Sequence, residues 1–335
     1  MPDRQATALA HPNIAMIKYW GNQDNILRLP SNASLSMNLA GLETVTMVAF
    51  SPALKDDELS IDGRPQSGVP AQRVSAHLDH IRRRAGLDLK ARVESHNSFP
   101  AGAGIASSAS AFAALTLAGV AAAGLALEER ELSALARLGS GSACRSVPAG
   151  FVEWQTGLSY QGGPLSEACD DSFAFSIAPP GHWALADVVA VVNGAPKAVS
   201  SAAGHALAHT SPFHAAHVAT AAERLECCRR ALFARDFAAL AEVVEADSNM
   251  MHAVMMTSEP PLFYWEAATL DIIKAVPGWR AGGLPVCYTV DAGPNVHCLC
   301  PAEAAPEVAR RLREELGVGR LITATPGGGA RLLDR

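Results

Sequence analysis

Lysine is the scarcest charged residue in this sequence, with only five among 335 residues, whereas the other 22 basic residues are arginine. Acidic residues outnumber basic ones, and the formal net charge is −6. A nucleic-acid-binding protein would show a basic face, so we expect no nucleic-acid partner. An anionic ligand would need local cations, and a lysine inside a motif is therefore informative. The five are Lys18, Lys55, Lys90, Lys197 and Lys274.

Cysteine spacings typical of metal sites or disulfide frameworks are also missing. The seven cysteines contain no C-x-x-C pair, and neither Cys227-Cys228 nor Cys298-Leu-Cys300 has a zinc-ligand spacing. The pairs His205/His209 and His214/His217 could each share a helix face, but no nearby carboxylate completes a metal set. We therefore expect reduced, mostly buried thiols in a cytoplasmic protein and no zinc site.

No apolar run is long enough for a membrane span. The longest, residues 111–127, falls short of the roughly 20 apolar residues that a span needs. The first residues lack the apolar segment of a secretory signal. Hydrophobic residues make up 49% of the chain and charged residues 18%, which is typical of a compact fold. We expect no membrane partner.

Apolar periodicity predicts a mixture of strands and helices without strict βαβ alternation, which indicates an α+β fold. Two strands, 34–39 and 44–50, are expected to pair antiparallel, and the proline-rich residues 51–70 are expected to form an exposed connection. Further strands are predicted at 7–10, 14–18, 89–95, 151–155, 183–192, 286–290, 296–300 and 321–325. Helices are predicted at 72–85, 111–127, 128–138, 212–239, 239–256 and 304–316.

A glycine- and serine-rich segment, residues 99–110, runs directly into the apolar helix. Glycine lets the backbone approach an anion closely, and free N–H groups at a helix start attract phosphate. Ser107 and Ser108 add hydroxyls for phosphate or for a Mg²⁺ shell. The segment is not a Walker loop, because no G-K-[ST] follows the glycines. On spacing alone, a structural turn remains the alternative.

Four segments in a fixed order carry a more specific signal. They are Pro12–Gly21 (P-N-I-A-M-I-K-Y-W-G), residues 99–110, residues 139–154 (G-S-G-S-A-C-R-S followed by G-F-V-E-W) and Asp291–Asn295 (D-A-G-P-N). Together they resemble the mevalonate (di)phosphate decarboxylases of the GHMP kinase superfamily over essentially the whole chain.

This resemblance implies a fold of two lobes with the active site in the cleft between them. We expect an N-terminal ATP-binding lobe over residues 1–182 and a C-terminal, ferredoxin-like lobe over residues 183–335. The resemblance further implies a cytoplasmic homodimer that uses ATP and Mg²⁺ in isoprenoid biosynthesis. ATP would phosphorylate a tertiary 3-hydroxyl, and loss of phosphate and CO₂ would follow.

That chemistry needs a carboxylate near the hydroxyl, a cation near the leaving phosphate and donors for the substrate carboxylate. By motif match, Asp291 takes the first role as base or electrostatic stabiliser, Lys18 the second and Arg145 the third. Read alone, Asp291 could instead begin a β-turn, Lys18 could lie on the surface and Arg145 could cap a helix.

The other site residues are implied by the resemblance. Expected substrate-binding residues are Asn13, Tyr19, Asn22, Ser140, Gly141, Ser142 and Ser201. Expected nucleotide-binding residues are Ala103, Gly104, Ser107 and Ser108, with Ser107 also in the Mg²⁺ shell.

The chain departs from the family pattern where cations are expected. Diphosphate-acting members usually read K-Y-W-G-K, but Asn22 stands in place of the second lysine. Ala202 follows V-S-S where several bacterial members have arginine, and Asp79 lies near an arginine position of eukaryotic members. Each lost charge-assisted contact costs about 1.5–3 kcal/mol. The compensating cations would be Arg28, Lys197 or Arg73.

We therefore predict decarboxylation of mevalonate 5-phosphate to isopentenyl phosphate. The first alternative is the same reaction on the 5-diphosphate, giving isopentenyl diphosphate. A 3-kinase without decarboxylation and a non-catalytic phosphate-binding protein are the others.

Overall fold

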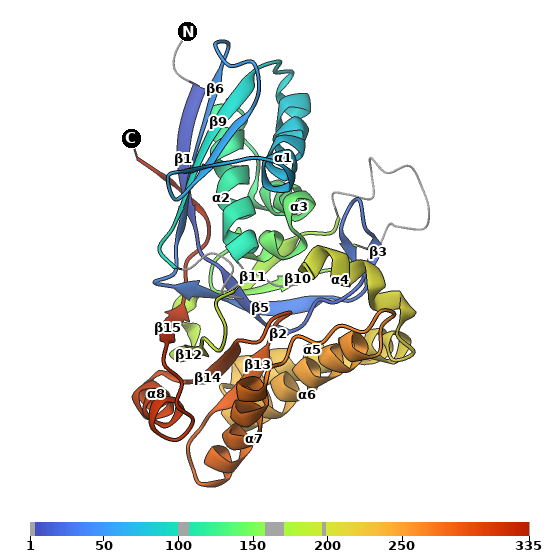
Figure 1. Ribbon diagram of the computed structural model, residues 1–335, viewed down its shortest axis with the longest axis vertical. Coiled ribbons are helices and arrows are strands. Elements are labelled where there is room, and N and C mark those ends of the chain that lie inside the picture. The colour runs from blue at the N-terminus through green and yellow to red at the C-terminus, as the bar shows by residue number, and fades with distance from the viewer. Residues whose placement is uncertain (1–3, 100–106, 158–170, 196–198, 335) are drawn as a thin grey trace.

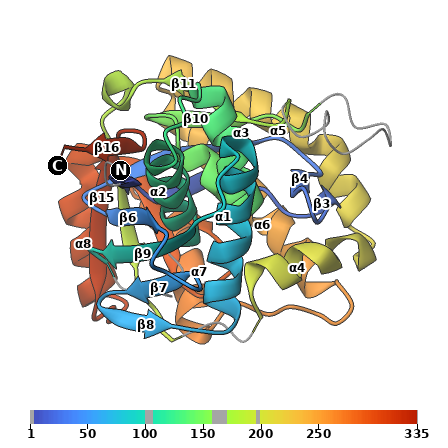
Figure 2. The same cartoon turned by 90° about the horizontal axis from the view of Figure 1, so that it is seen from above.

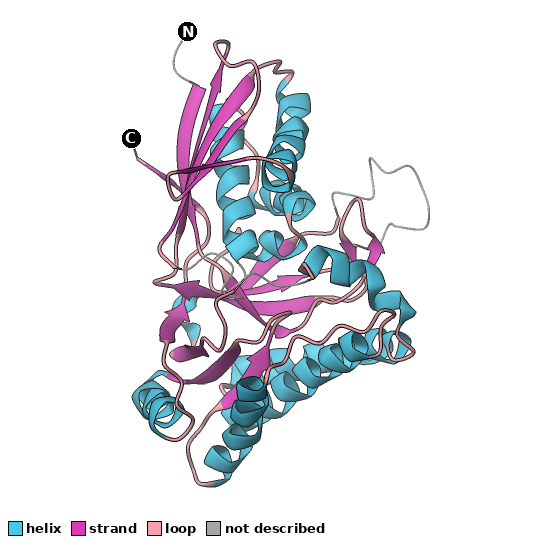
Figure 3. Ribbon diagram, viewed as in Figure 1, coloured by secondary structure: helices cyan, strands magenta, loops and turns pink. Residues whose placement is uncertain are grey.

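Two sheets and the helices packed on them form the molecule. A computed structural model describes residues 4–99, 107–157, 171–195 and 199–334 (Figure 1). The first sheet and three helices lie at one end of the long axis, and the second sheet crosses the middle (Figure 3). The remaining long helices pack at the other end.

The first sheet has the strand order β16-β1-β6-β9-β7-β8. Burial alternates along β6, as expected for a strand with one face on a core. The covering helices are α1 (Val69–Ala85), α2 (Ser107–Ala122) and α3 (Glu129–Gly139), which Figure 2 shows on one side of the sheet. The strands are β1 (Arg4–Ala10), β6 (Thr44–Ser51), β7 (Glu58–Ile61), β8 (Arg64–Gln66), β9 (Lys90–Asn97) and β16 (Arg331–Leu333).

The second sheet has the order β11-β10-β5-β15-β12-β14-β13, and β2 also pairs with β5. Six of the seven residues of β5 are buried, because this strand has partners at both edges and packs Leu35, Met37 and Leu39 into a hydrophobic core. The strands are β2 (Asn13–Ile17), β5 (Ser34–Ala40), β10 (Phe151–Trp154), β11 (Ala174–Ala178), β12 (Leu185–Ala190), β13 (Cys287–Val290), β14 (Val296–Pro301) and β15 (Leu321–Pro326).

The second sheet is covered by helices from the second half of the chain. Helices α5 and α6 enclose one core with β2 and β5, and α7 and α8 enclose another with β12 to β14. A short helix, α4, lies near the hairpin of β3 and β4. The bounds are α4 (Ser201–Leu207), α5 (His214–Ala234), α6 (Phe237–Met256), α7 (Ala267–Ala281), α8 (Ala305–Glu314), β3 (Asn22–Asp24) and β4 (Leu29–Pro30). Single 3₁₀ turns are η1 (Gly141–Ser146), η2 (Pro180–His182), η3 (Ala208–Thr210) and η4 (Ala302–Ala304).

The predicted pairing of strands 34–39 and 44–50 is wrong. These strands are β5 and β6, which belong to different sheets. Gly41, with φ 83°, lies in the link that carries the chain from one sheet to the other. The connection expected at residues 51–70 also contains β7 and β8. The apolar helix predicted to reach residue 127 ends at Ala122.

The two sheets do not follow the two halves of the chain. β16, from the end of the described chain, pairs with β1, and β15 pairs with β5. The division of the chain into two lobes at residues 182/183 therefore stays a prediction. Within the ranges given above, none of the helices has the length and apolar character needed to cross a membrane.

Candidate active site

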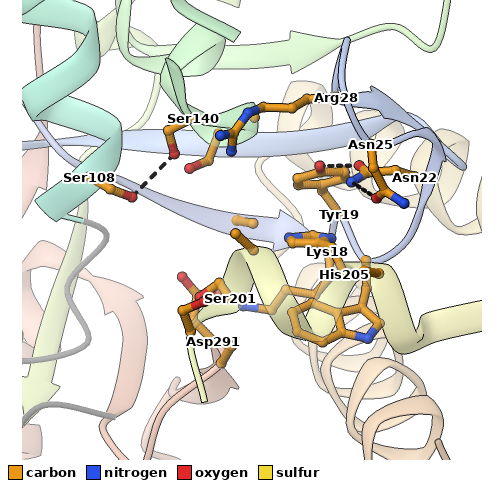
Figure 4. Close-up of a pocket in the computed structure, with 18 of the residues that line it drawn as sticks. Lys18, Tyr19, Asn22, Asn25, Arg28, Ser108, Ser140, Ser201, His205 and Asp291 are labelled. Carbon is orange, nitrogen blue, oxygen red and sulfur yellow. Dashed lines mark hydrogen bonds and ion pairs between the residues drawn. The ribbon is translucent and has the colours of Figure 1, made fainter. Parts of the chain in front are cut away.

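A cavity of about 510 Å³ lies where the ends of several elements converge (Figure 4). Its walls come from the residues after β2, the β3–β4 hairpin, the start of α2, η1, α4 and the turn after β13. Among the predicted residues that line it are Lys18, Tyr19, Asn22, Ser107, Ser108, Ser140, Gly141, Ser142, Arg145, Ser201 and Asp291.

Lys18 and Asp291 form an ion pair at the centre of this wall. The Lys18 Nζ lies 2.6 Å from Asp291 Oδ1. The lysine side chain is only 1% exposed, whereas the aspartate is 26% exposed and lines the cavity. Residues 273 positions apart in the sequence thus meet as a pair, and the carboxylate stays open to a ligand. The surface-lysine alternative for Lys18 is wrong.

Helix α6 supports both members of this pair. The Lys18 backbone N–H donates to Asp247 Oδ2 at 2.5 Å, and Asp247 is buried. The Val290 N–H, immediately before Asp291, donates to Ser248 Oγ at 3.0 Å. His252, on the same helix, lies 3.2 Å from the Val290 carbonyl oxygen through Nε2. One helix therefore fixes the backbone beside each of the paired side chains.

Arg145 lies in η1 and is 4% exposed. Its Nη1 donates to Ser34 Oγ at 2.8 Å and its Nε to Asn13 Oδ1 at 3.2 Å. Burial lowers the pKa of this guanidinium, and the charge of Asp291 opposes that shift. A buried cation with one edge held by neutral partners can offer its other edge to an anion.

Asn13 is the predicted substrate-binding residue that does not line the cavity. Its Nδ2 donates to Ser146 Oγ at 2.8 Å and its Oδ1 accepts from Arg145. The amide thus bonds to Arg145 behind the lining residues, and its role in substrate binding stays a prediction.

Tyr19 links the hairpin to α4. Its hydroxyl donates to Asn22 Oδ1, and its ring stacks on His205 with centroids 4.1 Å apart. The Gly21 N–H donates to His205 Nδ1 at 3.1 Å, so the ring proton is on Nε2. Burial lowers the pKa of His205 to about 3 and raises that of Tyr19. Both groups are therefore neutral near pH 7.

The serines at the start of α2 lie opposite η1. Ser108 Oγ is 3.2 Å from Ser140 Oγ, and Ser107 also lines the cavity. These hydroxyls lie beside the free N–H groups of a helix start, where phosphate binds well. The predicted nucleotide residues Ala103 and Gly104 lie outside the described residues.

Among the residues that the structure describes, the cavity wall carries four cations and a single carboxylate. Arg28 and Arg73 join Lys18 and Arg145, and Asp291 is the acid. Arg28 lies on the hairpin turn and Arg73 in the first turns of α1. The sequence offered both only as possible compensating charges, because no motif or periodicity marks them as pocket residues. Asn25, His205, Ser200 and Met251 line the cavity as well and were not predicted.

No cluster of three or more His, Cys, Asp or Glu side chains suited to a metal ion occurs in the described parts of the chain. The cysteines that the structure describes are free thiols, and five of the six are buried.

Two family models together match most of the chain. The diphosphomevalonate decarboxylase-like N-terminal domain matches residues 10–166, and the mevalonate 5-diphosphate decarboxylase C-terminal domain matches residues 187–324. A diphosphomevalonate decarboxylase of Ganoderma lucidum is 37% identical over 329 residues, which cover 91% of this chain and 80% of that protein.

Solved structures agree with these matches. The mevalonate diphosphate decarboxylase of Staphylococcus aureus superposes with a TM-score of 0.91 at 35% identity, covering 98% of each chain. A complex of MDDEF with MVAPP, AMPPCP and magnesium gives a TM-score of 0.91 at 36% identity, covering 99% of each chain. The predicted α+β fold of the GHMP kinase type is confirmed.

Proposed function

Since the chain belongs to the diphosphomevalonate decarboxylase family of the GHMP kinase superfamily, we propose that its substrate is mevalonate 5-diphosphate and its product isopentenyl diphosphate. The chain is an ATP-dependent decarboxylase of the mevalonate pathway. The 5-diphosphate was the alternative in the sequence analysis, where the 5-monophosphate was preferred.

One observation carries the choice of the diphosphate. The sequence lacks the expected cations at positions 22, 79 and 202, but the cavity wall holds Arg28 and Arg73 in addition to Lys18 and Arg145. Against these four cations stands Asp291, which already faces Lys18. Such a surplus of positive charge suits a ligand that carries a carboxylate and a diphosphate.

The reaction assigns a task to each side chain of the central group. Asp291 accepts the proton of the tertiary 3-hydroxyl, or stabilises the charge that develops there, as that oxygen attacks the γ-phosphoryl group of ATP. Lys18 neutralises the transferred phosphoryl group. Arg145 holds the substrate carboxylate. Departure of phosphate leaves positive character at C3, and loss of CO₂ supplies the electron pair of the new double bond.

ATP and Mg²⁺ fit the polar end of the cavity. The Ser107, Ser108 and Ser140 hydroxyls lie together at the start of α2 and can hold nucleotide phosphates. Mg²⁺ usually keeps several waters and binds through few protein ligands and the phosphates, which agrees with a single hydroxyl ligand from Ser107. When bound, the ion neutralises the phosphate charge. The solved complex with AMPPCP and magnesium supports this assignment.

A comparison of substrates tests the proposal. We expect kcat/KM to be about ten- to hundredfold higher for the 5-diphosphate than for the 5-monophosphate, because the monophosphate forgoes a charge-assisted contact. ADP and CO₂ should form in equal amounts. Faster turnover of the monophosphate would contradict the proposal, and ADP formation without CO₂ would identify a 3-kinase.

The monophosphate reaction is the second candidate, because of Asn22. The Asn22 amide lines the cavity where a lysine is usual in diphosphate-acting members of the family, and it carries no charge. The same assay separates the two candidates.

A further inference from the structure

We propose that Arg28 is the specificity-determining cation for the terminal phosphate of the substrate and that it replaces a cation missing at position 22. This inference rests on the proposed 5-diphosphate substrate. It concerns the β3–β4 hairpin, which places residue 22 on its first arm and residue 28 at the end of its turn, both next to one cavity.

The Asn22 amide is already used within the hairpin. Its Oδ1 accepts from the Tyr19 hydroxyl, and its Nδ2 donates to Asn25 Oδ1 at 2.9 Å. An amide bonded in this way links the first arm of the hairpin to the turn. It is therefore a structural residue and a poor phosphate ligand.

The backbone of Arg28 has an unusual conformation. It adopts φ 51°, one of three non-glycine residues with positive φ in the part of the chain that the structure describes. A left-handed conformation costs such a residue about 1–2 kcal/mol. The surrounding contacts must therefore hold it.

The residue before Arg28 supplies those contacts. The Leu27 N–H donates to Asp24 Oδ1 at 2.7 Å, and the Leu27 carbonyl accepts from Nη1 of Arg137, a fully buried residue of α3. The residue after it, Leu29, is 1% exposed. The turn is thus fixed on both sides of Arg28, and the guanidinium extends from a backbone that these contacts hold in place.

The guanidinium itself has no partner among the described side chains or backbone groups. It lines the cavity on the side of Ser140 (Figure 4), and burial lowers its pKa. Burial lowers the pKa of Arg73, the charge of Arg28 lowers it further, and both arginines line the same cavity. Arg73 is held by the Gly139 carbonyl at 3.1 Å and lies over the Phe112 ring. Two cations held on one cavity wall, where Asp291 is the only acid among the described lining residues and is paired with Lys18, form a site for a multiply charged anion.

The test uses three variants and two substrates. Arg28→Gln removes the positive charge, and Arg28→Lys keeps it. Asn22→Lys combined with Arg28→Gln restores a positive charge at position 22 instead. Arg235→Gln is the matched control, because Arg235 is exposed, has φ 55° and lies at the end of α5, away from the cavity.

We expect Arg28→Gln to lower kcat/KM for the 5-diphosphate about ten- to hundredfold, mainly through KM. The change for the 5-monophosphate should stay below about threefold. The double variant should recover most of the loss, Arg28→Lys should retain most of the activity, and Arg235→Gln should match the unmodified protein. Thermal unfolding checks that each variant is folded.

Two results would overturn the inference in distinguishable ways. If the unmodified protein prefers the 5-diphosphate but Arg28→Gln lowers kcat/KM equally for both substrates, Arg28 is not the specificity residue and the proposed function stands. If the unmodified protein prefers the 5-monophosphate, the proposed function and this inference fail together.

Discussion

At the scale of single residues, the central group depends on a lysine that is almost completely buried. An ammonium group removed from water is unfavourable unless a carboxylate faces it at short distance. Lys18 meets that condition through Asp291, whose Oδ1 lies 2.6 Å from its Nζ. The pair therefore needs both members for its structure as well as for the proposed chemistry.

Asp291→Asn should abolish most turnover and leave nucleotide binding largely intact. The amide keeps the shape but loses the charge and the proton-accepting oxygen, so kcat should fall roughly a hundred- to ten-thousandfold. Product release under saturating substrate measures kcat, and calorimetric titration with a non-hydrolysable ATP analogue measures binding. Asp271→Asn, which changes an exposed aspartate of α7, is the matched control. Loss of nucleotide affinity in Asp291→Asn would argue against a role confined to the reacting centre.

Motif spacing named Lys18, Arg145 and Asp291 for catalytic roles that stay predictions, and all three line one cavity. It could not find Arg28 or Arg73, because a hairpin turn and a helix face have no spacing that says which side chains will face a cavity. Asn13 shows that a residue in a matched motif does not always line the cavity. Its motif position is next to the site, but its amide faces Arg145 and not the cavity.

At the scale of elements, α4, α6 and the turn after β13 contribute to the part of the wall that comes from the second half of the chain. α6 fixes the backbone beside Lys18 and Asp291. α4 brings Ser201 and His205 against the residues after β2. The distance between these helices and the hairpin therefore sets the width of the site.

Gly204→Ala tests that packing. A Cβ at this position would lie 2.6 Å from Trp20 Cη2 and 3.2 Å from Leu262 Cδ1, so α4 or the Trp20 ring would have to move. We expect a loss of about 1–3 kcal/mol in the free energy of unfolding and an increase in KM. Denaturant unfolding and steady-state kinetics measure the two effects.

Gly278→Ala is the matched control, because Gly278 is also helical and its Cβ would meet open space. It should be neutral or slightly stabilising, by up to about 1 kcal/mol. An unchanged KM in Gly204→Ala would show that α4 can shift without disturbing the site.

Helices and strands were predicted from the sequence where their local signals are clear, and were missed where they are not. The helix predicted over residues 72–85 is confirmed as α1, which ends at Gly86 in a left-handed conformation. α3 begins with the capping box of Glu128 and Glu131. α7 was missed because Pro277 and Gly278 interrupt its sequence, although tertiary packing keeps it helical. β7 and β8 were missed because they are short; β7 begins with the charged Glu58, and β8, at the edge of the sheet, contains Pro65.

At the scale of the whole molecule, buried neutral histidines link stability to pH. His77, His217 and His252 lie in three different helices and are 2%, 0% and 1% exposed. Burial lowers the pKa of each to about 3, with nearby positive groups adding to the shift. The unfolded chain binds these protons near pH 6.5, so acid favours unfolding well before the folded protein can accept them.

The free energy of unfolding should therefore fall as the pH decreases from 7.5 to 5. Each of the three histidines contributes on the order of 1–2 kcal/mol to this fall. Guanidinium unfolding at several pH values gives the slope. Between pH 6 and pH 4, His77→Gln should reduce the slope of the unfolding free energy against pH by an amount equal to the uptake of nearly one proton on unfolding. An unchanged slope would contradict the assignment of a neutral, buried His77.

The pairing of β16 with β1 has a consequence for synthesis on the ribosome. β1 emerges early, but residues 331–333, which complete its edge of the first sheet, emerge only after every other strand has been made. Until then β1 has an open edge able to pair with another chain. A chaperone that shields this edge of β1 would therefore act until residues 331–333 have been made and have paired with it.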